Sequence, residues 1–495
     1  MLAKRSVLAA LSAPLLAAQI LELGSRRELF VDRLLIERMT GLQLRLGQTV
    51  DEGIALELNQ PWEGPFSGYF TVLKDGPVYR LYYRGLPAAG ADGNAREVTC
   101  YAESPDGIRW SKPSLGLYPI NGSTHNNVIL AGRPPFSHNF SPLLDARPGT
   151  PPAERYKALA GTSASGLHAF VSADGIRWRP LSERAVIPPP GGTAFDSQNV
   201  AFWSESEGRY VCYFRTWKRI GGTDYRWISR ATSLNFLDWS QPVEMSFGQA
   251  PPEHLYTNQT SPYFRAPQIY LGLCARFFPG RQVLSAEQAR AVRVDPRYYR
   301  DCSDAVLISS RGGDRYERTF LEAFLRPGLG WENWVSRSNY PALNIVPTGE
   351  SRMSFYVARN YGQPTAHLRR YTLRLDGLAS VHAGYAGGEL LTRPFRFRGR
   401  TLEINYSTSA AGGLRFEIQD EAGRPLPGYR LEESLEMTGD EIEAVVRWRG
   451  GADVGALQGK AVRLRVWLKD ADWYAFRFRP EPAPVQSAAF TARKD

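Results

Sequence analysis

The chain contains the stretch Ser104-Pro105-Asp106-Gly107-Ile108-Arg109-Trp110 and repeats it as Ser172-Ala173-Asp174-Gly175-Ile176-Arg177-Trp178. Two weaker copies follow, Ser233-Leu234-Asn235-Phe236-Leu237-Asp238-Trp239 and Ser310-Arg311-Gly312-Gly313-Asp314-Arg315-Tyr316. In such a tight turn an Asp or Asn acts as the cap, Gly supplies the positive φ, and the final aromatic ring folds back onto a sheet. The stretch therefore predicts one structural unit that recurs along the chain.

A second repeat consists of a turn followed by an aromatic-rich strand. Its five copies lie at residues 79–83, 156–159, 210–214, 269–272 and 353–357. Each unit has room for four short strands, and turn and aromatic signals that recur in this way are typical of a radial β array. We therefore predict an all-β fold, with a five-bladed β-propeller over residues 25–383.

Residues 384–480 follow a different pattern. Segments 402–406, 414–418 and 462–467 alternate apolar and polar side chains, as half-exposed antiparallel strands do, and the repeated turn is absent there. This pattern predicts a C-terminal β-sandwich. The Pro- and Ala-rich residues 481–495 are predicted to form a flexible tail.

Composition excludes several classes of protein. The 495 residues are 43% hydrophobic with a net charge of +10, which is too apolar for a disordered chain. No five basic residues are consecutive, so a nucleic-acid partner is not expected. The four cysteines are too few for a disulfide scaffold, but Cys274 and Cys302 flank one long loop and are the better candidates for a disulfide. The oligomeric state is left open.

The N-terminus has the features of an export signal. Lys4 and Arg5 precede an uncharged, Ala- and Leu-rich run that is too short for a membrane span. We predict a signal peptide over residues 1–18 and a secreted or periplasmic protein without a membrane-spanning segment.

With these features together, the chain resembles the five-bladed glycoside hydrolase superfamily, which includes the invertase-like family 32 and the arabinanase- and xylosidase-like family 43. Arg374-Leu375-Asp376-Gly377, which leads into the sandwich, is similar to the invertase-like arrangement. The chain lacks the Asn-Asp-Pro-Asn-Gly, Arg-Asp-Pro and Glu-Cys motifs of invertases. The resemblance implies a secreted glycoside hydrolase that cleaves a poly- or oligosaccharide with two carboxyl groups in the propeller funnel.

The resemblance also implies which residues face the ligand. In such propellers the ligand face is built from residues before the first strand of a blade, after its second strand, and at the start of its third strand. Among residues before first strands, the acids are Glu63, Asp196 and Glu253, and the other candidates for binding substrate are His138, Asn139, Gln198, Asn199, His254, Tyr256, Asn258, Trp334 and Arg337. Second strands are followed by Arg84, Arg215, Arg276 and Arg359, and third strands start with Glu97 and Asp304. Glu350 lies on the opposite face and is left out.

Glycoside hydrolysis needs two carboxyl groups, one as the proton donor and one as the nucleophile or base. We predict Asp196 as the nucleophile or base and Glu253 as the general acid, with Glu63 and Asp304 in reserve. His138 and His254 are expected to orient a hydroxyl group. The arginines either pair with these carboxylates or form a basic ring that binds an anionic sugar.

Other chemistries and functions remain as alternatives. The six histidines show no short metal-binding spacing, so no metal site or other cofactor is predicted, apart from a structural Ca²⁺ in the central channel, which is left open. A glycoside phosphorylase would use the arginines to bind phosphate. A non-catalytic carbohydrate-binding propeller would bind sugar without turnover, and a lyase would use a Tyr or His base on a uronate.

Overall fold

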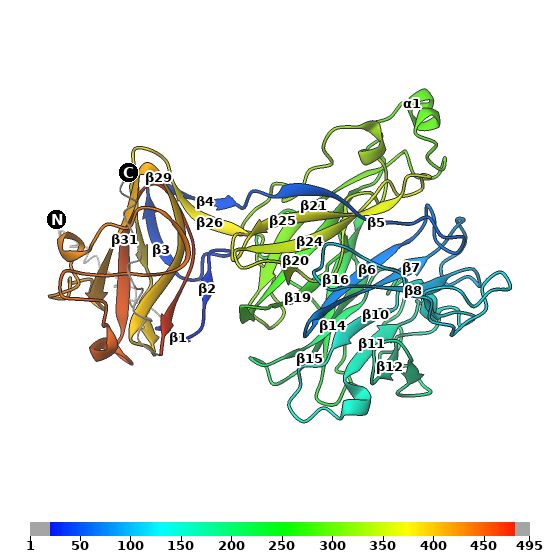
Figure 1. Cartoon of the computed structure of the whole chain (residues 1–495), viewed down its shortest axis with the longest axis horizontal. Coiled ribbons are helices and arrows are strands. Elements are labelled where there is room, and N and C mark those ends of the chain that lie inside the picture. Colours follow the sequence, from blue (N-terminus) through cyan, green and yellow to red (C-terminus); the bar gives the residue numbers. More distant parts are fainter. Residues whose placement is uncertain (1–19, 481–495) are drawn as a thin grey trace, which may run out of the picture. The chain divides into compact units, whose positions relative to one another are not determined.

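The computed structural model describes residues 20–480, which form two compact units (Figure 1). One unit contains residues 29–32 and 44–380, and the other contains the described residues 20–28, 33–43 and 381–480. The predicted signal peptide and C-terminal tail lie outside the described residues. No helix between residues 20 and 480 is long and apolar enough to cross a membrane.

The larger unit is the predicted five-bladed propeller, made of five antiparallel sheets. The first blade contains β6 (Gly68–Asp75), β7 (Val78–Gly85), β8 (Val98–Ser104) and β9 (Val128–Leu130). The second contains β10 (Ser141–Leu144), β11 (Tyr156–Ala160), β12 (His168–Ser172) and β13 (Arg179–Pro180). The third contains β14 (Val200–Ser204), β15 (Arg209–Ile220), β16 (Thr223–Ser233) and β17 (Val243–Glu244).

The innermost strands of the fourth and fifth blades are interrupted. The fourth blade contains β18 (His254–Thr257), β19 (Thr260–Tyr263), β20 (Ala266–Phe278) and β21 (Cys302–Ser310), with the short α1 (Ala286–Ala291) between its last two strands. The fifth contains β22 (Tyr340–Pro341), β23 (Val346–Pro347), β24 (Arg352–Arg359) and β25 (His367–Arg374). The five predicted aromatic strands lie in β7, β11, β15, β20 and β24, so the second repeat marks a central strand of every blade.

The repeated turn has the predicted hydrogen bonds. Ser104 Oγ accepts from the Gly107 N–H at 2.9 Å, and Asp106 Oδ1 accepts from the N–H groups of residues 108 and 109 at 2.8 and 2.9 Å. The copy at Ser172 repeats this pattern. In the third copy Phe236 adopts φ 68°, the left-handed region that Gly occupies in the other two.

The fifth blade is completed by an N-terminal strand. β5 (Val50–Glu57) pairs with β25, with Glu57 opposite His367. Residues N-terminal to β5 form β1 (Leu21–Gly24), β2 (Glu28–Leu29), β3 (Ile36–Thr40) and β4 (Leu42–Leu46), which belong to the sheet of the C-terminal unit. We expect from the sequence that the propeller starts at residue 25, whereas the strands before β5 belong to the other sheet. A local repeat carries no information on which distant strand completes a sheet.

The C-terminal unit is the predicted β-sandwich. Its other strands are β26 (Ala379–Ala383), β27 (Gly388–Thr392), β28 (Phe395–Phe397), β29 (Thr401–Asp420), β30 (Asp440–Val445) and β31 (Val462–Arg479). The long strands β29 and β31 pair along most of their length, with a register shift between Thr408 and Gly413. Such an irregularity lets one pair of long strands bend.

The expected disulfide between Cys274 and Cys302 is absent, and all four cysteines are buried free thiols. β20 and β21 run antiparallel with Cys274 opposite Val306 and Cys302 opposite Phe278. The two sulfurs are therefore displaced along the strands by four residues, roughly 13 Å, which is beyond the reach of a disulfide.

Candidate functional site

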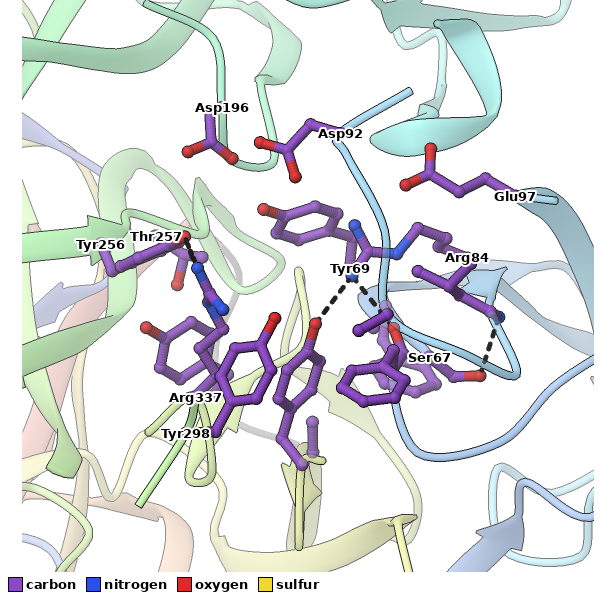
Figure 2. Close-up of a pocket in the computed structure, with 18 of the residues that line it drawn as sticks. Ser67, Tyr69, Arg84, Asp92, Glu97, Asp196, Tyr256, Thr257, Tyr298 and Arg337 are labelled. Carbon is purple, nitrogen blue, oxygen red and sulfur yellow. Dashed lines mark hydrogen bonds between the residues drawn. The ribbon is translucent and has the colours of Figure 1, made fainter. Parts of the chain in front are cut away.

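One end of the propeller holds a pocket of about 710 Å³, including its open mouth (Figure 2). Aromatic rings form much of its wall, and they belong to Phe66, Tyr69, Phe70, Tyr256, Tyr298, Tyr340 and Tyr361. Its charged groups are Arg84, Asp92, Glu97, Asp196 and Arg337. Aromatic walls with a few converging polar groups are typical of small-ligand sites.

The loop that carries Asp196 is fixed by buried amides. Asn139 Nδ2 donates to the carbonyl oxygens of Phe195 and Ser197 at 2.8 and 2.9 Å, and Asn199 Nδ2 donates to Phe195 O at 3.2 Å. Phe195 itself has φ 63°. Asn139 and Asn199 therefore position Asp196 and do not line the pocket.

Three segments around the pocket share a rare backbone conformation. Tyr69, Phe195 and Arg337 have φ values of 55°, 63° and 58°, in the left-handed region that bulky residues seldom adopt. Tyr69 is the second residue of β6 in the first blade, and Phe195 and Arg337 precede the first strands of the third and fifth blades. Strain of this kind persists where the surrounding structure holds it, and it concentrates at functional sites.

Asp92, His138 and Asp196 converge beside the pocket. His138 Nε2 lies 3.9 Å from Asp92 Oδ1 and 3.7 Å from Asp196 Oδ1, and Nδ1 lies 3.0 Å from Glu97 Oε1. Figure 2 shows the carboxylates of Asp92 and Asp196 facing one another. Arg215 Nη2 donates to Asp196 Oδ2 at 2.6 Å.

The two aspartates have opposite electrostatic surroundings. Burial acts to raise the pKa of Asp196, but His138 and Arg215 outweigh it and hold this pKa well below its usual range. Partial desolvation and the charge of Asp196 raise the pKa of Asp92, although its side chain is 57% exposed. Burial acts to lower the pKa of His138, whereas the carboxylates of Asp196 and Glu97 raise it, and the carboxylates have the larger effect.

Arg337 is a cation without a carboxylate partner. Its Nε and Nη2 donate to the Tyr256 hydroxyl at 3.3 and 3.1 Å, and its guanidinium lies 4.8 Å from the centre of the Tyr298 ring. Among the described residues no carboxylate lies within 4.0 Å of the Arg337 guanidinium. Burial acts to lower the pKa of Arg337, but four nearby tyrosines raise it. Arg226, 4.9 Å from the Tyr256 ring, is likewise unpaired among residues 20–480.

The predicted acid Glu253 lies away from this pocket. It pairs with Arg276 at 2.8 Å and with Arg318, and Arg276 also pairs with Asp304 at 2.7 Å. Glu253, His254 and Arg276 line a separate shallow groove. The structure therefore does not bring Glu253 or Asp304 to Asp196, and the ion-pairing interpretation applies to Arg276.

The remaining predicted residues are divided between the pocket and the interior. Arg84, Asp196, Tyr256 and Arg337 line the pocket, and His138 and Arg215 contact Asp196. Gln198 is buried and donates to Thr71 Oγ1 at 2.5 Å, and Asn258 Oδ1 accepts from the Thr260 N–H at 3.1 Å. Trp334 Nε1 donates to Gly328 O, and Arg359 donates to Pro327 O.

Glu63 has the contacts of a structural residue. It is fully buried, pairs with Lys112 at 2.6 Å and accepts from the Tyr83 hydroxyl at 2.5 Å. We expect Glu63→Gln to lower the free energy of unfolding by about 1–3 kcal/mol, because Lys112 loses its charged partner. Urea unfolding measures this loss, and the turnover of the folded fraction should equal that of the unsubstituted chain. A tenfold loss of turnover at unchanged stability would restore Glu63 as a catalytic candidate.

Asp92 and four tyrosines of the pocket, Tyr69, Tyr298, Tyr340 and Tyr361, are absent from the sequence-based set. Asp92 lies in the Gly-rich stretch Gly90-Ala91-Asp92-Gly93 between β7 and β8, a connection that belongs to the ligand face by the rule applied above. That rule could have identified it. Tyr298 and Tyr361 lie in the equivalent connections of the fourth and fifth blades, which the same rule covers. Tyr69 lies one residue inside β6, and Tyr340 begins β22.

The chain is similar to known proteins in its structure, but not in its sequence. No family model and no curated protein matches the chain. One similar solved structure is described as a glycoside hydrolase, with TM-score 0.43 and 10% identity over 66% of this chain and 92% of the other. A second is an N-acetylgalactosamine deacetylase from F. plautii in complex with blood group B trisaccharide, with TM-score 0.43 and 13% identity over 68% and 97% of the two chains.

A third similar structure is the catalytic domain of a GH62 α-L-arabinofuranosidase from Coprinopsis cinerea. Its TM-score is 0.40 and its identity 10%, over 68% of this chain and 99% of the other. Structures described as a glycoside hydrolase and as a GH62 α-L-arabinofuranosidase are thus among those to which this chain is similar.

Proposed function

We propose that this chain is a glycan hydrolase whose reaction centre is the carboxylate pair Asp92 and Asp196. The observation that carries the proposal is the position of this pair at the edge of a tyrosine-lined pocket. Tyrosine faces pack against the apolar faces of sugar rings, and carboxylates serve as nucleophile, base or proton donor. The resemblance of the repeat pattern to five-bladed glycoside hydrolases supports the same substrate class.

The first candidate reaction is cleavage of a glycosidic bond. Asp196 would be the nucleophile or base, because its contact with Arg215 favours the charged form. Asp92 replaces Glu253 as the proposed proton donor, since Glu253 is held by two arginines outside the pocket. One carboxylate oxygen of Asp92 lies within 4.8 Å of one of Asp196, so both acids could act on the same glycosidic bond.

The second candidate reaction is hydrolysis of an ester or amide substituent on a sugar. The observation that favours it is the third member of the cluster, His138, whose ring nitrogen lies within the same 4.8 Å as the two oxygens. A cluster of two carboxylates and an imidazole is better suited to activate a water molecule than to hold a sugar ring between two acids.

An anionic sugar is the proposed substrate class. Arg337 lines the pocket, is stacked among tyrosines and has no carboxylate partner among the described residues. A half-buried guanidinium of this kind is best stabilised by a carboxylate or sulfate of the ligand. Export of the chain, which residues 1–18 predict, is part of the proposal and is tested by locating the protein and sequencing its mature N-terminus.

The test is a product screen on uronate-containing, sulfated, acetylated and neutral glycans, with and without phosphate. New reducing ends indicate glycosidic cleavage, and released acetate indicates removal of a substituent. Asp92→Asn should abolish whichever product appears, and Asp224→Asn, in an exposed pair with Arg219, should not. Saturable binding of a glycan without any product would instead make the propeller a recognition module, and a requirement for phosphate would make it a phosphorylase.

A further inference from the structure

Asp92, His138 and Asp196 come from three separate parts of the propeller. Asp92 belongs to the connection between β7 and β8, His138 ends the short helix before β10, and Asp196 precedes β14. One potential ligand atom of each lies within 4.8 Å of the other two. Because the three residues are far apart in the sequence, a search for short metal-binding spacings misses them.

The buried ring nitrogen of His138 lacks a partner. The side chain is 1% exposed, and its Nε2 has no hydrogen-bond partner among residues 20–480. Nε2 is aimed between Asp92 Oδ1 and Asp196 Oδ1, at distances too long for hydrogen bonds. A cation placed between these three atoms would contact all of them.

The other side of the ring determines which nitrogen carries the proton. Glu97 Oε1 lies 3.0 Å from Nδ1, and a carboxylate can only accept there. Arg84 Nη1 lies 3.2 Å from Nδ1, and the backbone nitrogen of Gly93 lies 3.3 Å from Nδ1 but also donates to Glu97 Oε2 at 3.0 Å. In the tautomer in which Nδ1 donates to Glu97, Nε2 is the unprotonated nitrogen, and it lies on the side of the two aspartates. A carboxylate behind a histidine is the usual second shell of a metal-bound imidazole.

We propose that Asp92, His138 and Asp196 bind a divalent transition-metal ion, Zn²⁺ or Mn²⁺, beside the pocket. Mixed imidazole and carboxylate ligands suit these ions, and three protein ligands leave a position for water, as at catalytic sites. Arg215 occupies Asp196 Oδ2, so Oδ1 is free to bind the ion. Ligands at about 2.1 Å from an ion are about 3–3.6 Å apart, so the observed 3.7 and 3.9 Å require only a small contraction.

This inference shares its residues with the proposed function, but its test needs no substrate. An ion here would serve hydrolysis of a substituent, because it would occupy the two carboxylates that glycosidic cleavage needs. Either proposal can therefore fail alone.

The experiment is a calorimetric titration of the chelator-treated full chain with ZnCl₂ and, separately, with MnCl₂. Elemental analysis after gel filtration then measures the bound metal. We expect one ion per chain for at least one metal, with affinity at least 100-fold lower in His138→Gln and in Asp92→Asn. Glu97→Gln should lower affinity by about 10–100-fold, as loss of an outer-shell partner does. The matched controls are His254→Gln and Asp224→Asn, which should bind as the unsubstituted chain does.

Two results would overturn the proposal. One is the absence of saturable binding in the unsubstituted chain, which would leave a protonated His138 between the carboxylates. The other is binding that His138→Gln and Asp92→Asn leave unchanged, which would mean an adventitious ion. Asp92 is largely exposed, so its variant should fold even if the buried His138 variant does not.

Discussion

Replacing Asp196 by Asn is expected to lower kcat on the glycan substrate by about 10³-fold or more. Asn keeps the size of the side chain and one acceptor for Arg215, but it is neither a base nor an anionic nucleophile. It is also a poorer ligand for a cation, so the loss is expected for either proposed reaction. Initial rates on the substrate found in the product screen, measured at saturation, give the effect.

This variant needs a check of stability. Arg215 is almost fully buried, and its Nε and Nη1 already lack hydrogen-bond partners among the described residues. Loss of the charge on Asp196 should therefore also destabilise the fold, by about 1–3 kcal/mol. Substrate binding by the folded variant should persist, which separates lost chemistry from lost structure.

The Glu253→Gln variant is the matched comparison. Glu253 is also a carboxylate held by arginine, but it lies outside the pocket. Its substitution should lower stability and leave kcat within a few-fold. If Glu253→Gln abolishes turnover and Asp196→Asn does not, the reaction centre proposed here is wrong and the original choice of general acid was correct.

The blades could be predicted from the sequence because their signals are local. The turn at Ser104 and its copies are stabilised by hydrogen bonds between residues two or three positions apart, and the aromatic strands repeat the same pattern in each blade. Completion of the fifth blade by β5 depends on pairing between Glu57 and His367, which no local pattern reports. For the same reason, the pairing of the first strands with the C-terminal sheet was not predicted.

The site was predicted in part for a similar reason. Position on the ligand face follows from topology, and that rule gave Asp196, His138, Arg84, Tyr256 and Arg337. The rule does not say which acid is already neutralised by a neighbouring cation, and this depends on contacts such as Glu253 with Arg318 and Glu63 with Lys112. Asp92 lies in the middle of the connection between β7 and β8, where the sequence has no strand end to mark it.

Replacing Arg337 by Met is expected to raise KM for an anionic glycan by about 10–100-fold and to change KM for its neutral counterpart by less than about threefold. A charge-assisted hydrogen bond contributes about 1.5–3 kcal/mol, and Met keeps much of the packing against Tyr256 and Tyr298. The comparison is between a uronate substrate and the same substrate with its carboxyl group reduced.

Arg337→Lys and Arg219→Met distinguish the causes of such an effect. Lys keeps the charge but loses the planar pair of donors, so KM should lie between those of the unsubstituted chain and the Met variant. Arg219 is exposed and paired with Asp224, and its loss should leave KM unchanged. An equal rise in KM for the charged and the reduced substrates would mean that Arg337 only supports the tyrosine wall, and the proposal of an anionic sugar would then be withdrawn.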